Sequence, residues 1–294
     1  MNEKQRISVL KNLDIWKSGR ISIAPLRGGF TNHNYLVTDK NKKYVARFAP
    51  ETTKLLHLNR KSEIYNYNVA ARLGIGPKTT VYHPQHRLLI VEYLDGKVLK
   101  PKTARGPVMI KKIAKILKTL HNGPRLKNLI DPMNRGQGYT RLARRFKTWM
   151  PKHMDQYLEH LKLIEKRLGK LPRTYPCHLD IMIANVIITP TDTIKLIDWE
   201  YSSNADYRYD LSMLSVKGKF RAVEDRLLVR AYTGRDDEKL YSDIQLMKAV
   251  VYFAEAAYGI LQNALSDKSV NYKKYALMNL RGFEKITQRM LKDA

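Results

Sequence analysis

The chain has 294 residues, 44% of them hydrophobic, which suits one large domain or two lobes with a sizeable core. Its single cysteine, Cys177, excludes an internal disulfide framework and a thiolate metal cluster. The 54 Lys and Arg against 27 Asp and Glu give a net charge of +27, which favours anionic partners such as nucleotides, nucleic acid or an anionic membrane face.

The N-terminal segment MNEKQRISVLKNLDIWKSGR is broken by charges every few positions, so it is not a signal peptide. No run approaches the roughly 18 apolar residues that a membrane helix needs. The most apolar late segment, AVVYFAEAAYGIL, is interrupted by Glu255 and predicts a buried helix. We therefore expect a cytoplasmic protein without a transmembrane segment, with weak binding to anionic surfaces left open by its charge.

Residues 20–48 alternate like strands around the turn RGGFTNH and predict a small antiparallel sheet. The segment NRKSEIYNYNVAARLGI predicts one helix that ends at Gly74 or Gly76, before Pro77. KTTVYH and RLLIVEYL predict two more strands, separated by PQH.

After Asp95 and Gly96 the pattern becomes helical, with apolar residues at helical spacing up to HNGP. Residues 140–170 predict two long basic helices around Pro151, VIIT and TIKLID predict a strand hairpin, and the chain from Asp210 onward predicts helices. The expected fold class is α+β and bilobal, with a cleft between the lobes. The expected units are a small antiparallel β lobe with one helix, 1–95, and a larger, mainly helical lobe, 96–294.

The charge is distributed unevenly along the chain. Lys97 to Arg173 contains 21 Lys and Arg against 4 Asp and Glu, whereas His178 to Asp210 contains 6 Asp and Glu against 2 Lys and Arg. The basic stretch has an ordinary interpretation as a solvated helical surface. The acidic segment stands out because the rest of the protein is so basic.

The acidic segment begins with YPCHLDIMIANVII, in which Asp180 and Asn185 stand five positions apart. Protein kinases have this spacing between the catalytic Asp and a metal-binding Asn. Asp198, in LIDWE after the predicted hairpin, suits a second metal-binding carboxylate, because magnesium prefers oxygen ligands. Phosphoryl transfer needs this set of groups. The alternative is that these side chains cap turns around the hairpin.

His178 lies two residues before Asp180 and is a further candidate for the catalytic loop. We interpret it as a framework residue that fixes the loop by hydrogen bonds rather than as a proton carrier. Cys177, beside it, has no obvious nucleophilic role.

In the first lobe, RGGFTNHNY predicts a phosphate-approaching loop, although a plain hairpin turn explains it equally well. Glycines there let the backbone come close to phosphates. The candidate nucleotide-binding residues of this loop are Gly28, Gly29, Thr31 and Asn32.

Arg47, in the predicted strand YVARF, stands where a kinase carries its phosphate-pairing lysine, and Glu63 on the next helix is its candidate ion-pair partner. The alternative for Arg47 is a surface cation. IVEYLDG is the predicted hinge, where the adenine edge would bond backbone groups from Glu92 to Leu94.

The segments GGFTNHNYLV, YVARF, RKSE, LGIGP, EYLDG, CHLDIMIANV and LIDWEYSSNADYRYDLS together resemble the choline/ethanolamine kinase and aminoglycoside phosphotransferase superfamily. The similarity covers about residues 20 to 215 and is strongest to bacterial choline kinases of the lipopolysaccharide-decorating type, with thiamine kinases near.

The resemblance implies a bilobal protein-kinase-like fold and the use of ATP with magnesium to phosphorylate a small-molecule hydroxyl. It implies that Asp180 is the catalytic base, that Asn185 and Asp198 bind magnesium, and that Arg47 binds nucleotide phosphates with Glu63 as its partner. It also implies that one further Asp, Asp210, braces the catalytic loop.

A cationic amino alcohol is the expected acceptor, because such substrates need aromatic faces and nearby carboxylates. The candidates on the substrate side are Trp199, Glu200, Tyr201 and Asp210, although aromatic residues there are also explained as core. Choline is expected first. No tryptophan follows Trp199, however, so tyrosines would take that role, or ethanolamine or thiamine would be the acceptor.

Two other functional classes compete with this interpretation. An antibiotic kinase acting on polycations would favour a more acidic C-terminal lobe. A non-catalytic nucleic-acid-binding protein would explain the charge, but it lacks a recognisable reading motif and leaves Asp180, Asn185 and Asp198 unexplained. We therefore expect no specific nucleic-acid partner, and either a monomer or a dimer.

Overall fold

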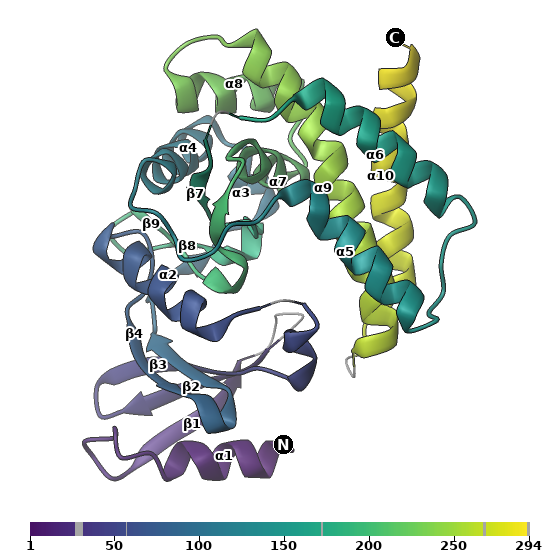
Figure 1. Cartoon of the computed structure of the whole chain (residues 1–294). Helices are drawn as coiled ribbons and strands as arrows, with labels where there is room; N and C mark the ends of the chain where they lie inside the picture. Colours follow the sequence, from purple (N-terminus) through teal and green to yellow (C-terminus); the bar gives the residue numbers. More distant parts are fainter. Residues whose placement is uncertain (27–31, 57, 172, 267–268, 293–294) are drawn as a thin grey trace.

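The computed structural model describes residues 1–26, 32–56, 58–171, 173–266 and 269–292 (Figure 1). Its first part is an antiparallel sheet in the order β1-β2-β3-β5-β4, accompanied by two helices. The elements are α1 (Glu3–Lys11), β1 (Ile21–Leu26), β2 (His33–Asp39), β3 (Lys42–Phe48), α2 (Arg60–Arg72), β4 (Thr79–His83) and β5 (Leu88–Glu92).

The two faces of this sheet belong to different cores. Side chains alternate along a strand, so Ile90 of β5 faces a small cluster with Leu10 of α1, whereas Leu89 and Val91 face the opposite way. That second face packs with Tyr67 of α2 and joins the core of the rest of the chain. The sequence patterns did not predict α1.

Helix α2 is bonded to the second part of the chain through buried polar side chains. The Asn66 side chain donates to the Ser202 carbonyl at 2.9 Å and accepts from the Lys127 backbone at 3.1 Å. One turn earlier, the Ser62 hydroxyl donates to Asn128 at 2.9 Å. The helix therefore connects the sheet to the helical part of the molecule.

The second part is mainly helical, and α5, α6 and α10 pack around α9 (Figure 1). Its helices are α3 (Pro101–Ala104), α4 (Pro107–His121), α5 (Pro132–Arg145), α6 (Met154–Leu168), α7 (Arg208–Gly218), α8 (Ala222–Thr233), α9 (Glu238–Leu265) and α10 (Tyr272–Lys292). Its short strands are β6 (Lys97–Val98), β7 (Tyr175–Cys177), β8 (Val186–Ile188), β9 (Ile194–Leu196) and β10 (Ser203–Ala205).

The predicted hairpin is β8 and β9, which pair in antiparallel register. The first of the two predicted basic helices begins earlier than expected, because Asp131 caps α5 and Pro132 takes its first position. Strands of two or three residues, β6, β7 and β10, escaped prediction because so few positions show no periodicity.

Among the described residues, α9 alone is long and apolar enough to cross a membrane, and 78% of its most apolar window is buried inside the protein. Its apolar residues pack against α5, α7 and α10. Burial inside the protein agrees with the prediction of a buried helix at this segment. The predicted α+β, bilobal fold class is confirmed.

Candidate active site

A cleft of about 510 Å³ lies where the sheet faces the loop after β7 and helices α5, α9 and α10. Both parts of the chain line it. Charged groups in its wall are the carboxylates of Glu92, Asp180, Asp198, Glu200 and Glu255 and the guanidinium groups of Arg47 and Arg135.

The loop after β7 presents Asp180 to this cleft. The Asn185 amide nitrogen donates to the Asp180 carbonyl at 3.0 Å and to its carboxylate at 3.2 Å, so the spacing of five residues closes the loop on itself. The amide oxygen of Asn185 takes part in neither bond. The Asp180 and Asn185 side chains therefore lie next to each other at the cleft.

Asp210, at the start of α7, holds this loop in place through hydrogen bonds to its backbone. Its two carboxylate oxygens accept from the backbone N–H groups of His178, at 2.8 Å, and Leu179, at 2.7 Å. His121 of α4 bonds the same carboxylate at 3.1 Å, and Asp210 has no exposed surface. Leu179 adopts the left-handed conformation with a φ of 61°, so these bonds stabilise a turn that a leucine does not favour.

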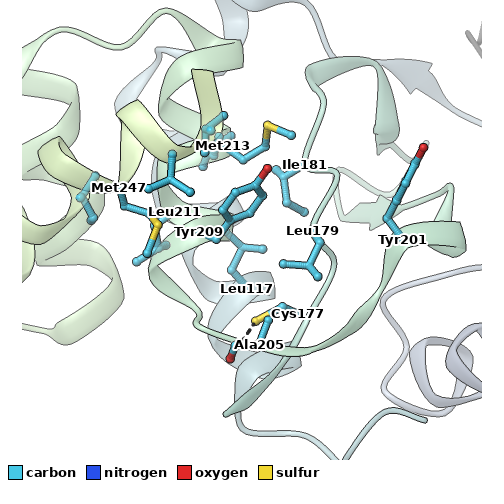
Figure 2. Close-up of a cluster of buried hydrophobic side chains, with 14 of the residues drawn as sticks. Leu117, Cys177, Leu179, Ile181, Tyr201, Ala205, Tyr209, Leu211, Met213 and Met247 are labelled. Carbon is cyan, nitrogen blue, oxygen red and sulfur yellow. Dashed lines mark hydrogen bonds between the residues drawn. The ribbon is translucent and has the colours of Figure 1, made fainter. Parts of the chain in front are cut away.

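Apolar side chains of the loop anchor it in the core. Leu179 and Ile181 are buried and lie beside Tyr209, Leu211 and Met213 of α7 (Figure 2). Leu179 and Ile181 thus face the core, while Asp180 between them lines the cleft.

His178 lies fully buried between the loop and the hairpin. Its Nδ1 accepts from the Asp180 backbone N–H at 3.3 Å, and its Nε2 donates to the Ile197 carbonyl at 3.0 Å. Burial lowers the pKa of His178 to about 4, so the ring is neutral near pH 7. These contacts are those of a framework residue, as interpreted from the sequence.

Asp198 follows β9 in the left-handed conformation, with a φ of 68° and a ψ of 64°, and this aims its carboxylate into the cleft. Its charge helps to shift the titration of Asp180. Burial first, and then the nearby charges of Asp198 and Glu255, raise the pKa of Asp180 to about 8.

Arg47, on β3, lies at the centre of a buried ion-pair network. Its guanidinium contacts Glu63 at 3.3 Å, Glu200 at 3.6 Å, and the Asp198 carboxylate and Tyr67 hydroxyl more closely. With 6% of its side chain exposed, it is not the surface cation that the sequence left open. The predicted Arg47–Glu63 ion pair is present.

A second cation, Arg60, closes the same network. It pairs with Glu63, lies 3.4 Å from Glu200, and donates to the Asn32 side-chain oxygen at 3.0 Å. Asn32 in turn donates to Glu200 at 2.8 Å. The other three candidates of the glycine-bearing turn, Gly28, Gly29 and Thr31, lie outside the described residues.

The predicted hinge residues Glu92 and Leu94 line the cleft. The backbone N–H groups of Glu92 and Tyr93 donate to the carbonyls of Lys78, at 2.9 Å, and Lys43, at 3.1 Å. These two donors are therefore already used within the chain.

The four substrate candidates divide into two pairs. Glu200 and Tyr201 line the cleft. Trp199 is instead fully buried, packs on the His178 ring at 4.7 Å between centroids, and donates to the Leu196 carbonyl at 3.0 Å. Asp210 is buried beneath the loop, so neither of these two lies in the wall of the cleft.

Sequence reasoning missed several residues that line or support the cleft. Arg60 lies in the quoted RKSE segment and Glu255 interrupts an apolar helix, so both left a signal. The others, Arg135, Lys217 and Tyr275, left none, because each comes from a separate helix in which it resembles an ordinary surface or core residue.

Comparisons with known proteins bear on the whole chain. The sequence model of the phosphotransferase enzyme family matches residues 22–242. Protein LicA of Haemophilus influenzae is 21% identical over 90% of this chain and 79% of its own length. Ethanolamine kinase 2 of Rattus norvegicus is 23% identical over 92% of this chain and 77% of its own length.

Among solved structures, choline kinase LicA from Streptococcus pneumoniae superimposes with a TM-score of 0.80 and 25% identity, covering 97% of both chains. This likeness agrees with the bilobal fold described above. Since the family match spans well over half of the residues, the chain belongs to the phosphotransferase enzyme family.

Proposed function

We propose that this protein is an ATP- and magnesium-dependent kinase that phosphorylates the hydroxyl group of a cationic amino alcohol. The observation that carries this proposal is the convergence of Asp180, Asn185, Asp198 and Arg47 in one cleft. Phosphoryl transfer depends on positioning and charge stabilisation more than on covalent chemistry, and these groups supply both.

Asn185 and Asp198 would hold the magnesium ion. An amide oxygen and a carboxylate are ligands that magnesium accepts, together with phosphate oxygens, and both residues line the cleft. The bound ion would neutralise charge on the phosphates. Arg47 would then exchange part of its contact with Asp198 for nucleotide phosphates, while Glu63 keeps it in place.

Asp180 would accept the proton of the acceptor hydroxyl on a carboxylate oxygen. Burial first, and then the neighbouring carboxylates, raise the pKa of Asp180 to about 8 in the metal-free protein, and a cation held by Asn185 and Asp198 would favour the deprotonated form that accepts a proton. The bonds of Asp180 with Asn185 orient the carboxylate. We assign His178 to the framework of this loop rather than to proton transfer.

The adenine ring would lie against the hinge from Glu92 to Leu94. The N–H groups of Glu92 and Tyr93 already have partners, so we expect adenine to use the Leu94 N–H and backbone carbonyl groups of the same segment. Gly28, Gly29 and Thr31 are proposed to approach the phosphates, and Asn32 to tie that loop to Glu200. Residues 1–95 and 96–294 are proposed as the two lobes.

The acceptor would be cationic because acidic side chains outnumber basic ones in the wall of the cleft, five against two. Glu200 and Tyr201 remain candidates for this side, whereas we assign Trp199 and Asp210 to support. Relatives with choline kinase or ethanolamine kinase in their names support the same class. We propose a cytoplasmic location and no specific nucleic-acid partner.

A panel of acceptors tests the proposal directly. ADP release would be followed with choline, ethanolamine, thiamine, an aminoglycoside and a neutral sugar, each with Mg·ATP. We expect turnover with an amino alcohol and none with the sugar. Turnover restricted to neutral sugars would overturn the proposal, and turnover restricted to thiamine or the aminoglycoside would move it to another acceptor class.

A further inference from the structure

We propose that Arg135 is a positioning residue for the transfer step: it fixes the peptide unit that leads into Asp180 and so aims the carboxylate that accepts the proton. The inference rests on the proposed function, in which Asp180 is the base. It goes beyond that function because it assigns a role to a residue of α5, which lies outside the catalytic loop and belongs to none of its motifs.

The backbone just before Asp180 needs support from outside the loop. Leu179 has a φ of 61°, a left-handed conformation in which the side chain crowds the backbone. Such a conformation persists only where the surrounding structure holds it. The partners of the backbone groups at Leu179 and Asp180 therefore decide where the Asp180 carboxylate lies.

Each of these backbone groups has a partner of its own. The Leu179 N–H donates to Asp210 at 2.7 Å, and the Asp180 N–H donates to the His178 ring at 3.3 Å. The Leu179 carbonyl accepts from the Arg135 guanidinium, also at 2.7 Å. This carbonyl and the Asp180 N–H belong to one planar peptide unit. Arg135 and His178 therefore hold the two sides of the same unit.

The Arg135 side chain is in turn fixed by two tyrosines. Its guanidinium lies 4.2 Å from the centre of the Tyr201 ring, which is within the range of a cation–π contact. Its Nε donates to the Tyr139 hydroxyl, one turn further along α5, at 3.4 Å. A planar guanidinium that is held in this way loses little freedom when it bonds a carbonyl.

The contacts of Arg135 suit this task. Its polar partners within the described part of the chain are the Leu179 carbonyl and the Tyr139 hydroxyl, and neither of these groups is a carboxylate. A buried cation is usually paired with an opposite charge, whereas this partly buried one is bonded to the backbone of the catalytic loop. A hydrogen bond from a charged donor is stronger than one from a neutral donor.

The bond to Arg135 should affect the rate more than nucleotide binding. Without it, the peptide unit before Asp180 can rotate, and the carboxylate moves away from the acceptor hydroxyl. A small misplacement of a reacting group can cost about 10²-fold in rate. The phosphates and the metal would still be held by Arg47, Asn185 and Asp198, so the affinity for nucleotide should change little.

A double-mutant cycle tests this role, with ADP release measured on whichever of choline and ethanolamine the protein turns over. Arg135→Met should lower kcat about 10²-fold and leave KM for ATP nearly unchanged. In the Asp180→Asn background the same substitution should lower kcat no further, because the group that Arg135 aims is already lost. Arg135→Lys, which keeps a charged donor, should recover part of the loss. Arg145→Met, at an exposed arginine of α5, is the matched control and should leave kcat unchanged.

A second measurement does not depend on turnover. Hydrogen exchange of the backbone amides of residues 178–185, followed by mass spectrometry, should be faster in Arg135→Met than in the wild type, and unchanged in Arg145→Met. Unchanged exchange in Arg135→Met, or a further loss of kcat in the Asp180→Asn background, would overturn the inference. If Arg135→Met fails to fold, Arg135→Lys replaces it in both measurements, with a smaller expected effect. Turnover of neither amine would contradict the proposed function, while the exchange rates would still decide whether Arg135 holds the loop.

Discussion

The two ends of the cleft are built in different ways. At the proposed nucleotide end, Asn185 and Asp198 come from short loops around one hairpin, and Arg47 comes from one strand. At the proposed acceptor end, Arg135, Glu255 and Tyr275 come from three separate helices. The first arrangement depends on the local backbone, whereas the second depends on how distant helices pack. Short sequence motifs therefore predict the first group of residues but not the second.

The largest expected effect lies where the two ends meet. Asp180→Asn should keep the fold and nucleotide binding but lower kcat by about 10²- to 10⁴-fold, because the amide cannot accept the hydroxyl proton. Steady-state kinetics with circular dichroism would check this. Asp192→Asn, in the exposed turn of the hairpin, is the control. A near-normal kcat would remove Asp180 from the role of base.

Asp198→Ala should act mainly on the nucleotide end. Losing a metal-binding carboxylate should abolish the dependence of nucleotide affinity on magnesium, so that calorimetry gives the same affinity with magnesium as with EDTA. Asp192→Ala should retain the dependence. Unchanged Mg·ATP affinity in Asp198→Ala would contradict the assignment.

Asp210→Asn tests the frame that both ends share. The amide replaces one of the two oxygens that accept from the loop backbone, and we expect the free energy of unfolding to fall by about 2 kcal/mol. Urea unfolding would measure it, with Asp192→Asn again as the control. An unchanged midpoint would mean that the loop does not depend on this carboxylate.

Glu255→Gln should leave the nucleotide end unchanged and has the smallest expected effect. Losing the charge weakens a charge-assisted hydrogen bond, so KM for the acceptor should rise about tenfold while KM for ATP stays constant. Glu159→Gln, on an exposed part of α6, serves as control. Equal changes in both KM values would show that the two ends are not separable.

Much of the fold was predictable because its elements are long and periodic. The five strands of the sheet and the helices around residues 60–72 and 107–121 match the predicted segments. Helix α1 was not predictable, because it buries only Leu10. Strands β6, β7 and β10 pair with segments that are distant in sequence, which no local pattern reveals.

The candidate site divides in the same way. Spacing along the chain was enough to predict Asp180, Asn185 and Asp198 as site candidates. Arg47 was predictable from its position within a strand. Trp199 is a substrate candidate in the sequence because it is an aromatic residue within the acidic segment. In the structure it lies in the core. Glu255 was noted only as a charge that breaks an apolar run, yet a buried carboxylate in such a helix is a signal for a site.

The polar bonds of α2 have a mechanical consequence. This helix belongs to the first lobe by chain order, but Ser62 and Asn66 fasten it to the second. Arg47 on β3 pairs with Glu63 on α2, so α2 couples the sheet to the helical part of the molecule. Any displacement of the sheet relative to α2 would therefore disturb the cation proposed to bind the nucleotide phosphates.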